Sequence, residues 1–423
     1  MSSETSFKAP KSAAVIGLGY VGLPTAALLA GAGVQTLGVD INQELLQSLD
    51  SGTFKPKEPG LFELVSEAKS LKTLKFSDAL EPSDAYIIAV PTPINEDKTP
   101  RMDYVLSAAR SIAKVLQAGQ LVILESTSPP GSTEMVAQQI KELRPDLDTT
   151  GKGSDSVKFA YCPERVLPGN ALHEIVNNER LVGGLTEESA LMAQSLYSMF
   201  TKGNIVICSD REAEMAKLVE NSFRDVNIAF ANEVARIATT LGVQARKVIE
   251  LANRHPRVNI LSPGVGVGGH CISVDPWFLI DSAPDVSSLI KSARKVNDGQ
   301  PLLMASEIAN LAKATEIRRI VCLGLSYKPN SDDLRESPSI TLVRKLIDEV
   351  DSLPILVLEP NVRESEVTRL FGEKVKTFSP EENLTSSDLV VELVDHDYFK
   401  QIDLGESLVV RIHGRGQANH GRN

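Results

Sequence analysis

The sequence predicts an α/β protein with two doubly wound parallel-sheet domains joined by a central long-helix segment. Short apolar runs alternate with helical patterns from residue 1 to 205. Residues 206–305 are mainly helical in pattern, and strand and helix patterns alternate again over residues 306–423. Because such alternation is typical of parallel sheets covered by helices, we expect three domains, with boundaries at 1–205, 206–305 and 306–423.

Composition narrows the class of protein. The chain has 423 residues, 42% of them hydrophobic, which is enough for several buried cores. A formal net charge of −11 argues against nucleic acid or an anionic membrane as partner. Four cysteines without paired spacing predict neither a metal site nor a disulfide framework. With no signal peptide and no apolar run of about 18 residues, we expect a soluble cytoplasmic protein.

In the first domain, an apolar strand at 12–17 is followed by an Ala- and Leu-rich helix ending near Ala32. Strands are then expected at 34–39, 85–90, 121–125 and 157–161, with helices between them. The polar, Gly-containing stretch 146–155 is expected to be an exposed loop.

The central segment is predicted to be a helix from Glu212 to about Leu251, without an obvious breaker. Such a helix could connect two domains and form a dimer surface, although its apolar stripe also fits an intramolecular core. Lys217 and Asn221 stand four residues apart, so both project from one face. Together they could stabilise a developing alkoxide, and the alternative is a solvated pair.

The last domain begins with a strand at 319–325, and Ser337 and Pro338 then fit an N-cap and a first helical residue. That helix is expected to end near Val350, before a strand at 354–358 that leads to Glu359. The outline repeats the first domain without its glycine pattern, which predicts a nucleotide-type domain with another ligand. The tail from Gly414 is expected to fray.

A glycine-rich turn follows the first strand and opens the first helix. Its glycines would let a pyrophosphate approach the helix N-terminus, and an acid at the end of the next strand would accept from ribose hydroxyls. Ile41 and Asn42 add no cation for a 2′-phosphate, so NAD is favoured over NADP. A ligand-free tight turn is the alternative. The residues assigned to NAD here are Gly17, Gly19, Tyr20, Val21, Gly22 and Asp40.

Cys271 directly follows a run of glycines, and Asp275 follows it by four residues. Backbone N–H groups of such a loop can stabilise a thiolate or an oxyanion. A buried cysteine beside a tight turn is the alternative, but the glycine density and the acid favour a nucleophile. Combined with NAD, a cysteine suits oxidation of an alcohol through an aldehyde, because a thiohemiacetal can lose hydride to become a thioester that water cleaves.

Loops after the other strands of the first domain should line a ligand crevice. They carry Thr92, Thr127 and the neighbours Glu164 and Arg165, for which a surface ion pair is the alternative. Arg257 belongs to a basic cluster before the glycine loop that could bind a diphosphate.

From Gly17 to about His413 the chain resembles the UDP-glucose/GDP-mannose dehydrogenase family. Its Gly-Gly-His-Cys element ending at Cys271 and the Val-Asp-Pro-Trp-Phe element around Asp275 are similar to the N-acetylmannosamine branch. The resemblance implies oxidation of UDP-N-acetyl-D-mannosamine at C6 with two NAD⁺, by a homodimer or larger homo-oligomer. UDP-N-acetyl-D-glucosamine is the alternative substrate. Two further hypotheses are a single-step dehydrogenase that uses Lys217 and a non-catalytic UDP-sugar-binding protein.

The resemblance also implies a role for each matching residue. The catalytic set is Cys271 as nucleophile, Lys217 and Asn221 for the oxyanion, Asp275 for proton transfer and water, and Thr127 and Glu164 in support. Thr92, Thr127 and Arg335 join the NAD site. The substrate set is Glu164, Arg165, Val166, Lys217, Asn221, Arg257, Gly268 and Lys328.

The chain departs from the family's pattern at three positions. Pro168 replaces a second acid of the glucose-specific relatives, so their full proton relay is not expected here. Val265 stands where this branch often has Pro. Arg411 stands where relatives tend to have Asp, and no function is assigned to it.

Overall fold

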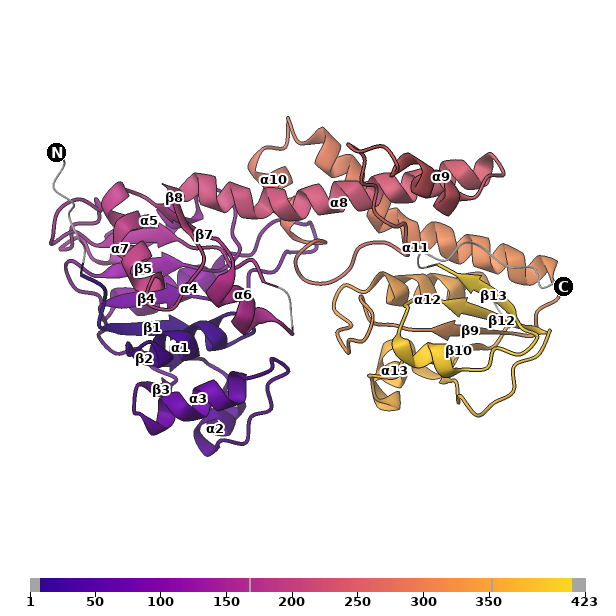
Figure 1. Ribbon diagram of the computed structural model, residues 1–423, viewed down its shortest axis with the longest axis horizontal. Helices are drawn as coiled ribbons and strands as arrows, with labels where there is room; N and C mark the ends of the chain where they lie inside the picture. The colour runs from indigo at the N-terminus through magenta and orange to yellow at the C-terminus, as the bar shows by residue number, and fades with distance from the viewer. Residues whose placement is uncertain (1–7, 167–168, 351–352, 413–423) are drawn as a thin grey trace. The chain divides into compact units, whose positions relative to one another are not determined.

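The computed structural model describes residues 8–166, 169–350 and 353–412. The chain forms two compact units, one of residues up to Val219 with Trp277–Ser282, the other of Glu220–Pro276 with the residues from Ala283 on. Helix α8 (Asp210–Thr240) begins in the first unit and ends in the second (Figure 1). The predicted α/β class is confirmed. Among the described residues, no helix combines the length and apolarity that a membrane span requires.

The first unit contains an eight-stranded sheet in the order β3-β2-β1-β4-β5-β6-β7-β8. The strands are β1 (Ser12–Ile16), β2 (Gln35–Val39), β3 (Leu74–Ser77), β4 (Ala85–Ile88), β5 (Leu121–Leu124), β6 (Lys158–Tyr161), β7 (Arg180–Gly184) and β8 (Ile205–Ser209). Neighbouring strands are parallel except β6 and β7, which pair antiparallel. The first residue of β7 therefore lies near the carboxyl end of β6.

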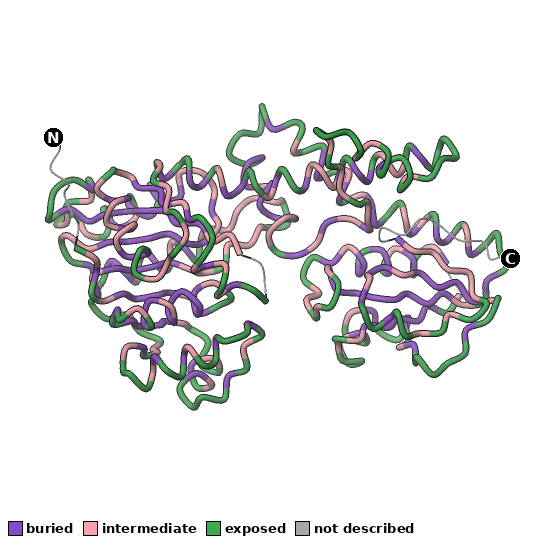
Figure 2. The backbone as a smooth tube through the Cα atoms, in the orientation of Figure 1, coloured by how far each residue is buried: buried purple, intermediate pink, exposed green. Residues whose placement is uncertain are grey.

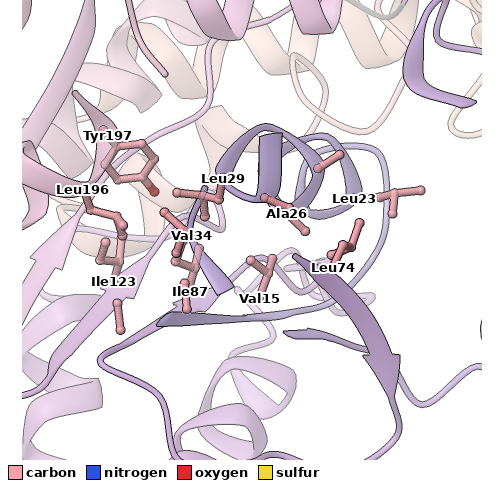
Figure 3. Packing of buried hydrophobic residues seen from close by; sticks show 14 of the residues in the cluster. Val15, Leu23, Ala26, Leu29, Val34, Leu74, Ile87, Ile123, Leu196 and Tyr197 are labelled. Carbon is pink, nitrogen blue, oxygen red and sulfur yellow. The ribbon is translucent and has the colours of Figure 1, made fainter. Parts of the chain in front are cut away.

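Helices cover both faces of this sheet. Apolar side chains of α1 (Gly22–Gly31), α2 (Gln43–Ser51), α3 (Leu61–Ser70), α6 (Ala171–Asn177) and α7 (Glu187–Tyr197) form one core with the strands. In Figure 3, Val15 and Ile87 of the sheet lie in this core with Ala26 and Leu29 of α1. On the other face, α4 (Asp103–Ala113) and α5 (Ser132–Leu143) form a second core. The central strands β1, β4, β5 and β6 are buried along most of their length, whereas the edge strands β3 and β8 are only partly covered (Figure 2).

The second unit contains a five-stranded parallel sheet in the order β11-β10-β9-β12-β13. This order repeats that of the first five strands of the other sheet. The strands are β9 (Arg319–Leu323), β10 (Ile355–Leu358), β11 (Val375–Thr377), β12 (Asp388–Glu392) and β13 (Leu408–Arg411). Its helical elements include α9 (Ala245–Ala252), α11 (Ser288–Ala314), α12 (Pro338–Glu349), α13 (Glu364–Phe371), η1 (Gly372–Lys374) and η2 (Asp397–Gln401). Helix α10 (Asp275–Ser282) begins in this unit, but its residues from Trp277 on belong to the first. One core joins the sheet to α11, α12 and α13.

Two sequence-based expectations need correction. The predicted helix from 212 to 251 is two helices, because the chain turns between α8 and α9, where Gly242 adopts a φ of +67°. Ser337 does precede the first residue of α12, Pro338, as expected. Its hydroxyl, however, donates to the Leu325 carbonyl at 2.6 Å instead of capping the helix. The tail from Gly414 lies outside the described residues.

A buried polar network connects α8 to α11 inside the second unit. Arg294 and Asp225, 1% and 0% exposed, form an ion pair with an N–O distance of 2.5 Å. The Asn297 amide donates to the same Asp225 oxygen at 2.8 Å. Asn232 donates to Asn297 at 3.0 Å and accepts from the Gly264 backbone N–H at 2.9 Å. The network therefore ends on the glycine-rich loop.

Replacement of Asp225 by Ala should strongly destabilise the second unit, because the charge of Arg294 would remain buried with one carboxylate partner fewer. We expect a loss of about 3–5 kcal/mol in the free energy of unfolding, measured from thermal and urea unfolding followed by circular dichroism. The matched control is Glu250→Ala, which breaks an ion pair with Arg246 whose side chains are half exposed. That variant should lose at most about 0.5 kcal/mol, and equal losses in both variants would contradict the prediction.

Candidate active site

The loop after β1 has the shape that a dinucleotide requires. Gly17 has a φ of +93°, and a Cβ there would lie 2.6 Å from the Ala89 carbonyl oxygen. A Cβ on Gly22 would lie 1.8 Å from the Gly17 carbonyl oxygen, so loop and helix could not approach as they do. A Cβ on Gly19 would meet no atom within 4 Å. The space beside Gly19, at the N-terminus of α1, is therefore open to a pyrophosphate.

Asp40 holds this loop in place from the end of β2. Its Oδ2 accepts from the Leu18 backbone N–H at 2.7 Å, and its Oδ1 accepts from the Asn42 N–H at 2.9 Å. Each oxygen keeps a lone pair, so the carboxylate can also accept from ribose hydroxyls. Tyr20 and Val21 lie between the glycines, Tyr20 36% exposed and Val21 at the N-cap of α1. These residues fit an NAD-type dinucleotide.

Two threonines connect the loops that follow β4 and β5. The Thr92 hydroxyl donates to the Thr127 carbonyl oxygen at 2.6 Å. The preceding Ser126 hydroxyl donates to the Val90 carbonyl oxygen at 2.7 Å. Both loops lie at the carboxyl edge of the sheet, beside the point where the strand order reverses between β1 and β4. The structure thus brings Thr92 and Thr127 together, as the crevice argument predicted.

Glu164, in the loop after β6, forms an ion pair that the sequence did not reveal. Its Oε2 lies 3.1 Å from Nη2 of Arg180, the first residue of β7. Nη1 of Arg180 lies 3.6 Å from Oε1 of Glu125, at the end of β5. The side chains of Glu164, Arg180 and Glu125 are 9%, 4% and 0% exposed. Arg180 reaches this edge because β7 runs antiparallel to β6. If β7 ran parallel to β6, its first residue would lie at the opposite edge of the sheet.

Lys217 lies on α8 with 8% of its surface exposed, and makes no hydrogen bond or ion pair with another described residue. Its ammonium group is therefore available to hydrogen-bond a ligand. One turn earlier, Glu214 accepts from the N–H groups of Gly131 at 2.6 Å and Thr133 at 2.8 Å. These bonds fix the first turns of α8 to the loop that carries Thr127.

The loop that carries Cys271 packs tightly against other parts of the second unit. A Cβ on Gly266, Gly268 or Gly269 would lie 2.9 Å or less from a neighbouring atom, so side chains would separate the loop from α11, α12 and Tyr327. The Gly269 N–H donates to the Arg335 carbonyl oxygen at 3.1 Å. Close packing of the glycines therefore fixes the loop just before the cysteine.

Asn221, Cys271 and Asp275 form one group in the second unit. The Asn221 amide donates to Oδ2 of Asp275 at 2.5 Å. The Asp275 N–H donates to the Cys271 carbonyl oxygen at 2.8 Å. Asp275 is 2% exposed, whereas Cys271 is half-buried. The carboxylate is thus fixed beside the thiol-bearing residue.

Arg335 and Tyr327 lie in the electrostatic field of Cys271. The hydrogen bond to Asp333 raises the pKa of Arg335, and Cys271 adds to the effect. Burial raises the pKa of Tyr327, with further contributions from Asp333 and Cys271. A cation at Arg335 favours the thiolate form of a neighbouring cysteine. Arg335 was assigned to NAD from the sequence, and that assignment stays a prediction.

The other predicted substrate residues belong to surface loops. Nη1 of Arg165 donates to the Glu179 carbonyl oxygen at 3.3 Å, and Val166 follows it half-buried. Lys328 Nζ lies 5.8 Å from the centre of the Tyr327 ring. Arg257 is exposed in the segment after α9. Their contacts with a substrate stay predictions.

The candidate residues thus belong to two groups, one in each unit. The first unit holds Gly17, Gly19, Gly22, Asp40, Thr92, Thr127, Glu164 and Lys217. The second holds Asn221, Arg257, Gly268, Cys271, Asp275, Lys328 and Arg335. Lys217 and Asn221 stand one turn apart on α8, as their spacing predicted.

Family models match three parts of the chain, all described as the UDP-glucose/GDP-mannose dehydrogenase family. The NAD binding domain matches residues 11–201, the central domain 211–299 and the UDP binding domain 321–412. These matches agree with the loop geometry at Asp40 and identify NAD as the cofactor.

Curated relatives and solved structures match over nearly the whole chain. The UDP-N-acetyl-D-mannosamine dehydrogenase of Escherichia coli strain K12 is 47% identical, over 92% of this chain and 94% of its own. The NDP-N-acetyl-D-galactosaminuronic acid dehydrogenase of Ralstonia nicotianae is 46% identical, over 93% and 92%. The structure of a UDP-D-ManNAc dehydrogenase from Pyrococcus horikoshii superposes with a TM-score of 0.84, at 38% identity and 95% coverage of both chains.

Replacement of Gly19 by Ala should weaken NAD binding without destabilising the protein. The added methyl meets no protein atom within 4 Å but enters the space beside the N-terminus of α1. We expect at least a tenfold rise in the NAD dissociation constant, about 1.4 kcal/mol, measured by calorimetry, with an unchanged thermal midpoint in the absence of NAD. The control is Gly299→Ala on α11, which also meets no atom within 4 Å and should bind NAD normally.

Glu214 should make the stability of the protein depend on pH. Burial raises its pKa to about 7 from an ordinary value of 4.5, although Thr133 and Gly131 donate to the carboxylate. Because the folded state favours the protonated form, this contribution is fully present below about pH 4.5 and is lost as the pH rises through 7. In Glu214→Gln the side chain stays neutral, so the thermal midpoint should fall less between pH 5 and pH 8 than in the native protein.

The matched control for Glu214 is Glu250→Gln, because Glu250 is half exposed. Its midpoint should follow the native pH profile. A Glu214→Gln profile parallel to that of the native protein would contradict the prediction.

Proposed function

Since this chain belongs to the UDP-glucose/GDP-mannose dehydrogenase family, we propose that it oxidises C6 of UDP-N-acetyl-D-mannosamine to the uronic acid. The family makes it an NAD-dependent dehydrogenase of UDP-sugars, and the substrate and the covalent mechanism are the further step. The observation that carries the mechanism is the fixed group of Cys271, Asp275 and Asn221 on one glycine loop and one helix.

Bound NAD⁺ supplies a hydride acceptor. Gly17, Gly19 and Gly22 would leave room for its pyrophosphate, and Asp40 would accept from a ribose hydroxyl. Tyr20, Val21, Thr92, Thr127 and Arg335 are proposed to line the same site.

In the first oxidation, the C6 alcohol loses a proton and a hydride and becomes an aldehyde. We assign the stabilisation of the alkoxide to the ammonium group of Lys217, which has no hydrogen-bond or ion-pair partner among the described residues. Asn221, one turn further along α8, can donate to the same oxygen. Thr127 and Glu164 are proposed to support the transfer of the proton.

In the second oxidation, the Cys271 thiolate adds to the aldehyde carbon and forms a thiohemiacetal. Loss of a second hydride gives a thioester, and water then cleaves the C–S bond to yield the carboxylate and the free thiol. Asp275 is suited to take a proton from that water, because Asn221 fixes its carboxylate and burial removes competing solvent. Arg335 favours the thiolate that leaves.

The nucleotide handle would be held by side chains away from the reacting carbon. We propose that Arg165, Val166, Gly268 and Lys328 contact the UDP-sugar, and that Arg257 contributes from its exposed segment. Binding energy from this handle can hold C6 at the nicotinamide.

Assembly into a homodimer or larger oligomer is supported by apolar side chains on α8 and just after it. Phe223, Phe230, Ile237 and Leu241 recur at intervals of seven and four residues, and each is more than half exposed. Such a stripe is typical of a helix that packs against another chain. Cysteines without paired spacing fit a reducing compartment, so we propose a cytoplasmic location.

The choice of substrate rests on the relatives. Those named UDP-N-acetyl-D-mannosamine dehydrogenase support the mannosamine sugar, whereas the relative from Ralstonia nicotianae favours an N-acetylgalactosamine-type substrate. UDP-N-acetyl-D-glucosamine, which differs from UDP-N-acetyl-D-mannosamine only in its configuration at C2, is the third candidate. Initial rates of NADH formation with these three sugars and UDP-glucose decide among them. The highest kcat/KM with another sugar would overturn the mannosamine assignment.

Cys271→Ser should abolish uronate formation. A serine hydroxyl adds to the aldehyde less readily than a thiolate, and a serine alkoxide is a poorer leaving group when water attacks the acyl carbon. The native enzyme should form about two NADH per uronate, measured by absorbance and by chromatography of the sugar nucleotide. Cys208→Ser, on β8, is the control and should keep native turnover. About one NADH per uronate in the native enzyme, or near-native uronate formation by Cys271→Ser, would contradict the thioester mechanism.

A further inference from the structure

Arg180 lies at the carboxyl edge of the first sheet because of one reversed strand. β7 runs antiparallel to β6, so the residue that begins β7 lies beside the loop that follows β6. The Arg180 side chain is 4% exposed, and a fully buried guanidinium normally needs ionic partners.

Those partners come from two neighbouring strands. Nη2 donates to Oε2 of Glu164 at 3.1 Å, and Nη1 forms an ion pair with Oε1 of Glu125 at 3.6 Å. The guanidinium also lies over the ring of Tyr197, 4.5 Å from its centre. It therefore spans two carboxylates while an aromatic face fixes its plane.

Glu125 also accepts hydrogen bonds from hydroxyl groups of two helices. It accepts from Tyr197 at 3.1 Å and from Thr25 of α1 at 3.3 Å. Tyr197 belongs to the apolar core drawn in Figure 3, and Thr25 is 0% exposed. The anchor of Arg180 is thus part of the packed core, whereas Glu164 belongs to a half-buried loop.

One cation is therefore shared between two carboxylates of different environment. Burial lowers the pKa of Arg180, but Glu164, Tyr197 and Glu125 outweigh this, so the guanidinium stays charged. Burial raises the pKa of Glu125 to about 7, against the effect of Arg180. Cys162 also faces Arg180, and burial raises the pKa of its thiol.

We propose that Arg180 is a positioning residue, which, anchored on Glu125 and Tyr197, holds the Glu164 carboxylate in one orientation for acid–base work on the substrate. The inference rests on the acid–base role proposed above for Glu164. Without Arg180, Oε1 of Glu164 would keep the backbone N–H of Arg165, which donates to it at 2.7 Å, but Oε2 would lose its donor at 3.1 Å and the guanidinium charge.

The test is a double-mutant cycle on the purified full-length enzyme with Glu164→Gln, Arg180→Gln and the combined variant. Arg180→Gln should lower kcat about 10- to 100-fold, part of what a general acid–base group contributes, with little change in the KM for NAD. The combined variant should be no slower than Glu164→Gln alone, because Arg180 acts through Glu164. Multiplicative losses in the combined variant would overturn the inference.

The split between kcat and KM gives a readout that a merely structural role would not produce. Arg180→Gln should lower kcat while the KM for NAD stays near the native value, because only the donor to Oε2 of Glu164 at 3.1 Å is lost. Arg180→Lys keeps the charge but cannot bond both carboxylates, so kcat should recover only in part. A KM for NAD that rises as much as kcat falls in Arg180→Gln would contradict the proposal.

Two further comparisons distinguish a failure of the acid–base role of Glu164 from a failure of the inference about Arg180. Near-native activity of Glu164→Gln would refute the acid–base role itself, and with it this inference. An impaired Glu164→Gln beside a near-native Arg180→Gln would refute the inference alone. Arg211→Gln is the matched control, since its ion pair with Glu134 is mainly exposed, and it should keep native kcat. If Arg180→Gln does not bind NAD, Arg180→Lys takes its place in the double-mutant cycle. A native kcat in Arg180→Lys would then overturn the proposal.

Discussion

The buried ion pair of Asp225 and Arg294 is the constraint on which the geometry around the cysteine depends. Both side chains are almost fully removed from water, so neither tolerates the loss of its partner. Through Asn297 and Asn232 the pair connects to the N–H of Gly264, where the glycine loop begins. The start of the loop that carries Cys271 is thus tied to two packed helices, α8 and α11.

The first unit uses carboxylates in a related way, and two of the three, Glu125 and Glu214, are buried. Asp40 fixes the nucleotide loop, Glu214 fixes α8 to the loop after β5, and Glu125 anchors Arg180. In each case an acid at a strand end or helix face accepts from backbone or guanidinium groups of another element. An NAD-dependent dehydrogenase needs the loops of its site in position before a substrate binds. These acids hold the loops there through contacts inside the folded protein.

Much of the fold and of the candidate site could be predicted from the sequence. The nucleotide loop was identifiable because only glycine allows the contacts at Gly17 and Gly22. Cys271 and Asp275 were identifiable because they follow a glycine run at short spacing. The helix break at Gly242 was missed, since an isolated glycine does not by itself end a helical pattern. Arg180 was missed because it begins an ordinary apolar strand, far in sequence from both acids it contacts.

The sequence by itself determined the α/β class, the NAD loop, the cysteine loop and the pairing of Lys217 with Asn221, because each depends on residues close together in the chain. Only the tertiary structure decided that β7 runs antiparallel to β6, and hence that Arg180 meets Glu164 and Glu125. Strand direction follows from the packing of whole helices and sheets, which no local pattern records. Buried charge networks depend on such long-range placement, so they become visible only once the fold is known.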